Sequence, residues 1–404
     1  MKRIVEKVIE NILRFCGATT TIVILLIIAF LFKEGFGLFK SSAVESGYSL
    51  CVNSANPIEH ISSFAIKEIF DHKIENWKDV GEKKSAEFNH DIELFRFDDI
   101  FKLYNEEEFG DNYEKLPGKL GEVIAQSTGI IAYIPTEYLP KNVSGVKVLE
   151  GNSISPEDFF LGLEWIPTAT PAPQFGMLPL ILGTLWVSIV AILLATPLGL
   201  GVAICLSELS KGKIRDILKP AIELLAGIPS VVYGFFGLVV LVPLVQRTFG
   251  LPVGETAFTG SLILAIMALP TIITVAEDAM RSTPRAMREA SLALGATHWQ
   301  TIYKVVVPYA ASGISAAVVM GIGRAIGETM TVLMVTGNAA IIPKTLFAPV
   351  RTIPATIAAE LGEAPAAGAH YQALFVLGCV LFLITLTISI VAELISKRQH
   401  NKGL

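Results

Sequence analysis

Two charged residues stand four positions apart in an otherwise apolar stretch of this sequence. Arg324 and Glu328 are the only charged residues in the segment 310–335, which is long enough to cross a membrane. Each charge at the centre of a bilayer costs about 3 kcal/mol on insertion scales, so such residues usually serve a function. An arginine guanidinium donates two parallel hydrogen bonds, a geometry that suits a tetrahedral oxyanion. The pair therefore predicts a path for an anion.

The spacing of the pair supports this interpretation. A separation of four residues predicts that both charges lie on one face of a helix. Small and hydroxyl residues share that stripe and indicate a wall of a water-filled path: Ala317, Gly321, Gly327 and Thr331. We predict that the path residues are Arg324, Glu328, Thr329 and Thr331. The alternative is an intrahelical ion pair that only stabilises packing.

A second pattern lies in a polar loop between two apolar segments. The loop contains Glu289-Ala290-Ser291, three residues, Gly295, nine residues, and then Val305-Val306-Val307-Pro308. This order resembles a motif written as Glu-Ala-Ala, three residues, Gly, nine residues, Ile-x-Leu-Pro. Ser291 stands in place of the third residue, and Val305 and Val307 stand in place of Ile and Leu. We predict that a cytoplasmic motor couples to this loop, 282–308, through Glu289, Ala290, Ser291, Gly295 and Pro308. An ordinary amphipathic loop helix is the alternative.

Capping signals predict two short helices in the loop. Thr283 can cap the first helix with Pro284 at its first position, and Gly295 can end it in a left-handed turn. Thr297 can begin the second helix, and Pro308 resets the chain before the next span. Two rigid helices on a loop suit a membrane protein that receives motion from a soluble partner.

The whole sequence is typical of a polytopic membrane protein. Hydrophobic residues make up 52% of the chain and charged residues 17%, with a mean hydropathy of +0.57. Six segments are apolar enough to be spans of roughly 20 residues. They are 16–32, 180–207, 224–245, 261–276, 310–335 and 371–395, with the fourth extended by the neutral residues before it. Pro229, Pro243 and Pro270 predict kinked or broken helices around a cavity.

Basic residues predict the orientation, because they concentrate in cytoplasmic loops. With both termini cytoplasmic, the inside segments carry Lys2, Arg3, Lys7, Arg14, Lys211, Lys213, Arg215, Lys219, Arg281, Arg285, Arg288, Lys304, Lys397, Arg398 and Lys402. The two short outside loops carry only Arg247, Lys344 and Arg351. The first span is predicted to be a retained anchor within residues 1–35, since charges crowd the region where a signal peptide would be cleaved.

The segment 33–179 differs from the rest in charge. It contains 13 Lys and Arg against 24 Asp and Glu, a net charge of −11. This predicts a soluble extracytoplasmic region, and nothing in it indicates nucleic-acid binding. Within it we expect an α/β insert at residues 40–162. Strands are predicted at 48–52 and 92–97, and helices at 64–70 and 101–109.

Several separate motifs resemble the permease core of phosphate-specific ABC importers. They are Trp165-Ile-Pro, Phe175-Gly-Met-Leu-Pro-Leu-Ile-Leu-Gly-Thr-Leu, Leu225-Ala-Gly-Ile-Pro-Ser-Val-Val-Tyr-Gly and Arg324-Ala-Ile-Gly-Glu-Thr-Met-Thr-Val-Leu-Met-Val. The last of these resembles the PstC type of subunit more than its PstA-type partner. The resemblance covers residues 163–397. It implies an all-α permease fold of six transmembrane helices, into which the α/β domain is inserted.

This resemblance also implies function and partners. The chain would be the membrane subunit of an ATP-driven phosphate importer in the cell (inner) membrane. Its partners would be a PstA-type permease, PstB-type ATPase subunits, an extracytoplasmic phosphate-binding protein, phosphate and membrane lipid. No Gly-x-x-x-x-Gly-Lys-Ser/Thr loop occurs, so ATP hydrolysis is expected in the partner subunits, and we expect no cofactor or metal in this chain. An importer of molybdate or tungstate, or a receptor of phosphate status, is the alternative.

The insert is longer than the loop that the family usually has at this place. Ser54-Ala-Asn-Pro, Glu68-Ile-Phe-Asp-His-Lys-Ile-Glu-Asn-Trp-Lys-Asp-Val-Gly and Thr128-Gly-Ile-Ile-Ala-Tyr-Ile-Pro resemble one lobe of phosphate-binding proteins. The lobe's anion loop usually reads Arg-x-Asp/Glu-x-Ser-Gly-Thr. Here Arg96 is followed by Asp98 and Asp99 without the small hydroxyl donors, so we expect that the insert does not bind phosphate by itself.

Other charged residues indicate less. Glu223, Glu277, Asp278 and Glu393 stand near the cytoplasmic ends of spans, where we expect solvated charges. His298, inside the loop 282–308, is expected at the surface. The glycines Gly227, Gly234 and Gly237 predict close helix packing in the third span.

Overall fold

The computed structural model describes residues 2–81, 87–140, 144–149, 153–210 and 213–402. The chain forms two compact units. The first contains Met1–Met177 and Ala364–Val376, and the second contains Leu178–Glu363 and Leu377–Leu404. The first unit ends later than the predicted insert boundary at residue 162. It also includes the short antiparallel strand pair β5 (Trp165–Ile166) and β6 (Gln174–Phe175).

Apolar helices confirm the membrane character. Within the described residues five helices are long and apolar enough to cross a membrane, and a bent pair of helices makes a possible sixth. The five are Ile9–Lys40, Leu178–Leu209, Ser230–Phe249, Ala257–Arg281 and Ala369–Val391, and the pair is His298–Tyr309 with Ala311–Ile326. Lys211 lies outside the described residues, and the side chains of Lys2, Arg3, Lys397, Arg398 and Lys402 are not described.

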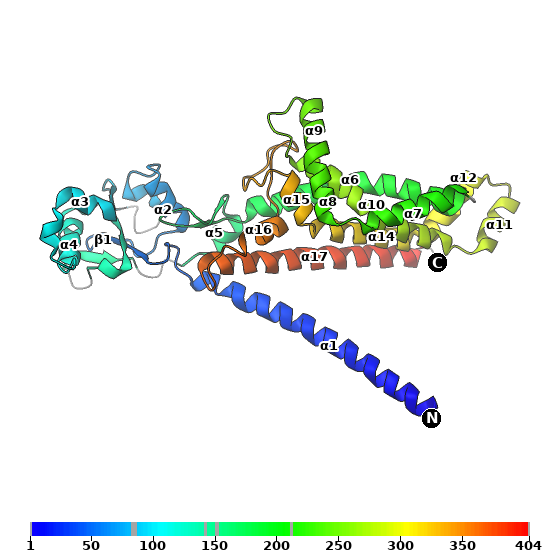
Figure 1. The fold of residues 1–404 in the computed structure, drawn as a ribbon, viewed down its shortest axis with the longest axis horizontal. Helices are drawn as coiled ribbons and strands as arrows, with labels where there is room; N and C mark the ends of the chain where they lie inside the picture. Colours follow the sequence, from blue (N-terminus) through cyan, green and yellow to red (C-terminus); the bar gives the residue numbers. More distant parts are fainter. Residues whose placement is uncertain (1, 82–86, 141–143, 150–152, 211–212, 403–404) are drawn as a thin grey trace. The chain divides into compact units, whose positions relative to one another are not determined.

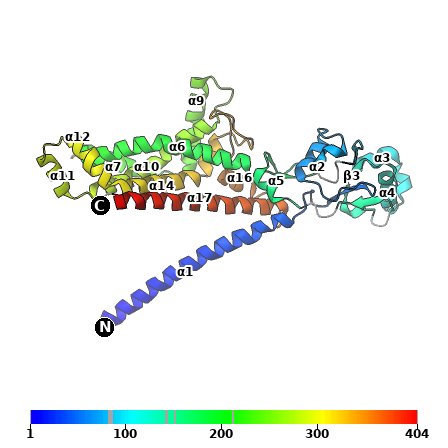
Figure 2. The same ribbon diagram turned by 180° about the vertical axis from the view of Figure 1, so that it is seen from behind.

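The helices of the second unit pack around α10 (Ala257–Arg281), which is the most buried of the candidate spans (Figures 1 and 2). On one side of α10 runs α6 (Leu178–Ile204), and on another runs α14 (Ala311–Ile326). Glycines permit this close approach. A Cβ atom on Gly199 of α6, or on Gly321 of α14, would lie 2.8 Å from the side chain of Ile272 on α10.

Two of the predicted spans differ from the structure at their prolines. The third span begins at α8 (Ser230–Phe236), not at residue 224, because Pro229 stands outside the helix as its N-cap and Leu224 belongs to α7 (Lys213–Gly227). A π-helical turn at Gly237–Leu241 connects α8 to α9 (Val242–Phe249). Pro270, predicted to interrupt the fourth span, lies inside the continuous helix α10.

The prediction of close packing by glycines is confirmed at two positions. A Cβ atom on Gly234 would lie 2.7 Å from Met334 Sδ, and one on Gly237 would lie 2.8 Å from Val335 Cγ1. Both neighbours belong to α15 (Met330–Val335). Gly227, in contrast, faces open space. A short helix, α16 (Ile353–Glu360), lies between the fifth and sixth predicted spans.

The first unit holds the α/β insert. Its sheet has the strand order β2-β3-β1-β4, in which β1 (Tyr48–Asn53) pairs antiparallel with β3 (Ile130–Pro135) and β4 (Val146–Val148). Strand β2 (Glu93–Arg96) runs parallel to β3. Alternate residues of β1 face opposite sides: Leu50 and Val52 pack with α2 (Ser63–Phe70), and Cys51 packs with α4 (Leu116–Gln126). Both predicted strands and the first predicted helix are confirmed.

The second predicted helix of the insert, 101–109, is wrong as a single element. The structure has α3 (Ile100–Leu103), a break at Tyr104, and a 3-10 turn at Glu106–Phe109. Asn105 takes part in a capping box with Glu108 and so starts the second turn anew. Two of the three motifs that resemble a phosphate-binding lobe are in contact, since the Trp77 indole N–H donates to Gly129 O over 2.8 Å.

The first unit also contains α1 (Lys2–Phe36), which includes the predicted anchor span, and the first turns of α17 (Ala369–Lys402). Helix α1 and the segment just after it both contact α17. The rings of Phe30 and Phe375 lie 5.6 Å apart edge to face, and Ser41 donates to Gln372 Oε1 over 2.5 Å.

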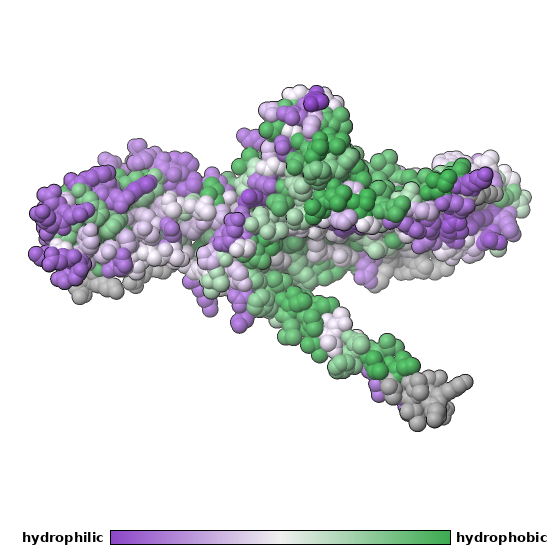
Figure 3. Space-filling view, in the orientation of Figure 1, coloured by the Kyte–Doolittle hydropathy of each residue, from purple (hydrophilic) through white to green (hydrophobic). Residues whose placement is uncertain are grey.

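Figure 3 shows apolar surfaces along the long helices and hydrophilic ones over the insert and around the α11–α12 region.

Candidate functional site

The predicted anion path centres on a break between two helices. α14 ends at Ile326, and α15 begins at Met330. Gly327, Glu328 and Thr329 separate them. The expectation that Arg324 and Glu328 lie on one helical face is therefore wrong, because the helix stops between them. Glycine at position 327 weakens the helix, and Glu328 offers a cap for the next one.

Arg324 lies half-buried in the last turn of α14. Its Nη1 atom donates to Thr271 Oγ1 on α10 over 3.5 Å, which is a long hydrogen bond. Among the described residues it forms no ion pair within 4 Å. Most of its donor groups are therefore available for an anion.

Glu328 binds the backbone of α15. Its Oε1 atom accepts from the Thr331 N–H over 3.3 Å, so the carboxylate stands at the start of that helix. A negative charge there is favoured by the helix dipole. The predicted alternative, an intrahelical pair with Arg324, does not form within the described part of the chain. Glu328 thus stabilises the second helix and leaves the guanidinium uncompensated.

The remaining residues of the predicted stripe divide into two groups. Ala317 and Gly321 are buried against other helices, so they serve packing within this chain and do not line an open wall. Thr331 is also buried, and its hydroxyl donates to Ser230 O over 2.9 Å. Thr329 differs, because together with Gly327 it opens on a groove of about 520 Å³ whose other lining residues come from α16, the turn after it and Leu381 of α17.

The predicted motor-coupling loop forms two short helices, α11 (Arg285–Ala293) and α12 (His298–Thr301). Gly295 has φ +86°, the left-handed conformation predicted for the end of the first helix. Thr297 caps α12, with its side chain accepting from the Gln300 N–H as predicted. Beyond them, the chain bends by 70° between His298–Tyr309 and Ala311–Ile326, just after Pro308.

The predicted cap of α11 is wrong. Pro284 stands at the N-cap position without a side-chain hydrogen bond, and the hydroxyl of Thr283 is buried without a partner among the described residues. Glu289 lies in the middle of α11 and is exposed, as is Ala290, whereas Ser291 is half-buried. The Ser291 hydroxyl lies 3.0 Å from that of Thr301, which joins the two helices.

Apolar side chains project from this polar loop, a feature that the motif did not predict. Leu294 is 89% exposed and Trp299 59% exposed, and Met287 and Tyr303 are exposed as well. His298 is exposed, as expected. Exposed large apolar groups on a loop offer a surface that another protein can cover. The sequence could have indicated them, because they are apolar residues in a loop whose helix ends are marked by Gly295 and Thr297.

One residue of the loop connects it to the membrane helices. Arg288 Nη2 lies 2.8 Å from Glu208 Oε1, in the π-helical end of α6, and also donates to Met280 O of α10 over 2.8 Å. Both side chains of the ion pair are largely buried. These two contacts connect α11 to the ends of α6 and α10.

A second ion-pair cluster corrects an expectation. Glu277, expected to be solvated, is 1% exposed and binds three cations: Arg215 at 3.1 Å, Lys219 at 3.5 Å and Arg281 at 3.4 Å. These contacts attach α7 to α10. The signal in the sequence was the spacing of four residues in both helices, between Arg215 and Lys219 and between Glu277 and Arg281. Glu223, Asp278 and Glu393 are exposed, as expected.

Replacing Glu277 by alanine will therefore destabilise the protein strongly. Removing one partner of a buried cluster leaves charges without compensation and typically costs about 3–5 kcal/mol. Thermal unfolding in detergent measures the effect, and Glu223→Ala is the matched control because Glu223 is exposed on α7. Equal melting temperatures for the two variants would contradict the structural role of the Glu277 cluster.

The sequence matches a protein-family model over the helices described above. The model described as "Binding-protein-dependent transport system inner membrane component" matches residues 195–401, which include the loop 282–308 and the helix break.

Three curated relatives are similar to this chain over most of their length. The probable ABC transporter permease protein YqgH of Bacillus subtilis is 38% identical over 277 residues, which cover 69% of this chain and 87% of the relative. The phosphate transport system permease protein PstC of Mesorhizobium japonicum is 40% identical over 254 residues, 58% of this chain and 76% of the relative. The phosphate transport system permease protein PstC 1 of Mycobacterium bovis is 32% identical over 324 residues, which cover 71% of this chain and 96% of the relative.

Proposed function

Because the chain belongs to the family of binding-protein-dependent transport system inner membrane components, we propose that it is the permease subunit of an ATP-driven phosphate importer. The observation that carries the substrate is the similarity to phosphate transport permeases, at 37–40% identity in three of them. The chain is a PstC-type transporter subunit, and ATP hydrolysis takes place in partner chains.

The proposed path for phosphate passes the break between α14 and α15. Arg324 supplies an uncompensated guanidinium that an oxyanion can bind in transit. Thr329, in the break itself, lines the groove that opens there. Transport requires that this binding be weak enough for release. A single arginine that is half-exposed, without a ring of further cations among the described residues near it, satisfies that requirement.

The proposed coupling route begins at the exposed apolar residues of α11 and α12. ATPase subunits cover Leu294 and Trp299, and their closure on ATP moves the loop. Arg288 transmits the movement to Glu208, and the spans rock between outward-facing and inward-facing states. The complete importer contains a PstA-type permease, PstB-type ATPase subunits and an extracytoplasmic phosphate-binding protein.

The proposed orientation places both termini and the loop 282–308 in the cytoplasm and residues 33–179 outside, in the inner membrane. Its support is the excess of basic residues in the inside segments and the acidic composition of the insert. This orientation presents α11 and α12 to cytoplasmic ATPases and the insert to a binding protein.

Co-purification tests the proposed class of protein. An affinity-tagged chain, expressed with the other genes of its importer and extracted in mild detergent, will bring ATPase subunits and a second permease with it. A Leu294→Glu/Trp299→Glu double variant will lose the ATPase subunits and keep the second permease. A receptor of phosphate status would instead purify without an ATPase, and that outcome would contradict the proposal.

A further inference from the structure

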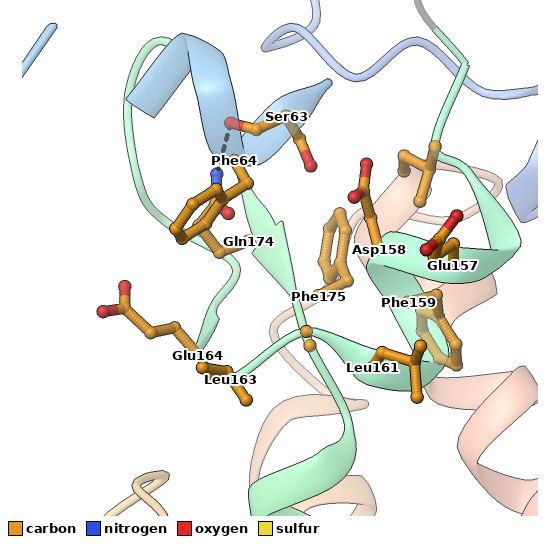
Figure 4. Close-up of a pocket in the computed structure, with 13 residues that line it drawn as sticks. Ser63, Phe64, Glu157, Asp158, Phe159, Leu161, Leu163, Glu164, Gln174 and Phe175 are labelled. Atoms are coloured by element: carbon orange, nitrogen blue, oxygen red, sulfur yellow. Dashed lines mark hydrogen bonds between the residues drawn. The ribbon is translucent and has the colours of Figure 1, made fainter. Parts of the chain in front are cut away.

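The first unit contains a pocket that the proposed phosphate path does not use. Its volume is about 270 Å³. The residues that line it come from α2, from α5 (Pro156–Leu161), from the loop after α5 and from β6 (Figure 4). We call it the α2–α5 pocket. All of these elements belong to the first unit, so the pocket is complete within it.

The walls of the pocket are apolar. Phe64, Phe159 and Phe175 contribute aromatic rings, and Leu161 and Leu163 contribute aliphatic side chains. Leu161 is 61% exposed and Leu163 53% exposed, which is unusual for leucines beside a cavity. A ligand with a hydrocarbon portion would remove this apolar surface from water.

Carboxylates occupy the same pocket. Glu157, Asp158 and Glu164 all line it. Neither Glu157 nor Asp158 has a basic partner among the described residues, and burial raises the pKa of the Asp158 carboxyl. Glu164 lies 3.2 Å from Lys67 Nζ, but Lys67 also binds Asp71 at 2.9 Å and so is shared between two acids. The pocket therefore has an excess of negative charge.

A hydroxyl group that makes no hydrogen bond within the described residues also lines this pocket. Ser63 is only 5% exposed and lines the pocket, and its hydroxyl makes no hydrogen bond within the described residues. In Figure 4 the side chains of Ser63 and Asp158 face one another across the space. The Gln174 amide nitrogen does not bind the Ser63 hydroxyl, because it donates to the backbone oxygens of Ser63 and Ala172. The Ser63 hydroxyl can therefore accept a hydrogen bond from a group that enters the pocket.

We propose that the α2–α5 pocket receives a lysine or arginine side chain of the extracytoplasmic binding protein. The apolar walls suit the hydrocarbon stem of such a side chain, the aromatic rings favour a cation, and Asp158, Glu157 and the Ser63 hydroxyl accept its hydrogen bonds. This inference rests on the proposed function, because it assigns a docking site to one of that importer's partners.

Charge selects the binding protein over free phosphate as the occupant. The segment 33–179 has a net charge of −11, which repels an anion and attracts a basic protein surface. Complementary charges speed the encounter, and a side chain buried in a central pocket gives specificity. The insert thus carries a docking site for the phosphate-loaded binding protein.

A binding titration tests the inference. The complete importer in nanodiscs is titrated with the purified, phosphate-loaded binding protein of the same organism. The Glu157→Gln/Asp158→Asn double variant will bind it about tenfold or more weakly, because two charge-assisted contacts are lost. The fold is retained, since the cap of α5 uses the Asp158 backbone N–H and the Ser155 hydroxyl.

The matched control removes the same charge elsewhere on the insert. Glu93 and Glu107 are exposed and do not line the pocket, and Glu93→Gln/Glu107→Gln will change the affinity less than twofold. Carbodiimide cross-linking will join a lysine of the binding protein to Glu157 or Asp158 if a lysine is the occupant. Unchanged affinity in the pocket variant, or an equal loss in the control, would overturn the inference.

Failure of the proposed function looks different. If the unaltered importer neither binds the phosphate-loaded protein nor increases its ATPase rate when that protein is added, the importer assignment itself fails. If the unaltered importer responds and the pocket variant responds equally well, only the docking site is wrong.

Discussion

Glu289→Lys will abolish phosphate uptake while the chain still inserts and pairs with its second permease. Glu289 is exposed in the middle of α11 and makes no ion pair within the described residues. Reversing its charge therefore leaves the permease itself intact, and the loss arises at the contact with the ATPase. Uptake by intact cells should fall to the background of a strain without the importer, and the ATPase subunits should no longer co-purify.

A matched charge reversal on the same side of the protein is Glu223→Lys, which should keep uptake within twofold. Gly295→Asp should resemble Glu289→Lys, because it places a charge next to Leu294. No atom lies within 4 Å of a Cβ at position 295, and asparagine and aspartate both tolerate left-handed conformations. Gly295→Asn should therefore keep part of the activity. A Glu289→Lys importer that assembles and hydrolyses ATP normally would remove the coupling assignment.

Arg324→Gln will lower phosphate uptake by a factor of about one hundred or more, since it removes the positive charge that we assign to the path. Only one long hydrogen bond, to Thr271, is lost and no ion pair of the described structure is broken, so assembly and thermal stability should remain. Arg324→Lys keeps the charge without the planar guanidinium. Its uptake rate should therefore lie between those of Arg324→Gln and the unaltered importer.

Initial rates of labelled phosphate uptake measure the series at equal amounts of assembled importer. Glu328→Gln should have a smaller effect than Arg324→Gln, because an amide oxygen can still accept from the Thr331 N–H. Uptake at the unaltered rate in Arg324→Gln would reduce this arginine to a structural role and leave the path unassigned.

Local signals predicted the loop 282–308 well. Gly295 and Thr297 occupy the conformations that their residue types favour, because a left-handed turn and an N-cap depend on a few adjacent residues. The prediction that Thr283 caps α11 is wrong by one residue. Its hydroxyl is buried, and Pro284 takes the cap position instead. At such ends, tertiary contacts decide between neighbouring candidates.

The path region was predicted less well, because periodicity alone cannot locate a break in an apolar helix. The stripe of Ala317, Gly321, Arg324 and Glu328 has perfect helical spacing, yet the chain leaves the helix at Gly327. Ala317 and Gly321 then pack inside the chain. The Glu277 cluster was missed for a related reason: its cations at Arg215 and Lys219 come from another helix, and only the fold brings them near.

ATP-driven uptake of labelled phosphate into proteoliposomes tests the central claim most directly. The complete importer is reconstituted with its ATPase subunits facing ATP and with the binding protein and phosphate on the other side. We predict accumulation that requires both ATP and the binding protein and that excess molybdate or tungstate does not suppress. Accumulation of molybdate or tungstate in place of phosphate, or no ATP-dependent transport of phosphate at all, would contradict the account.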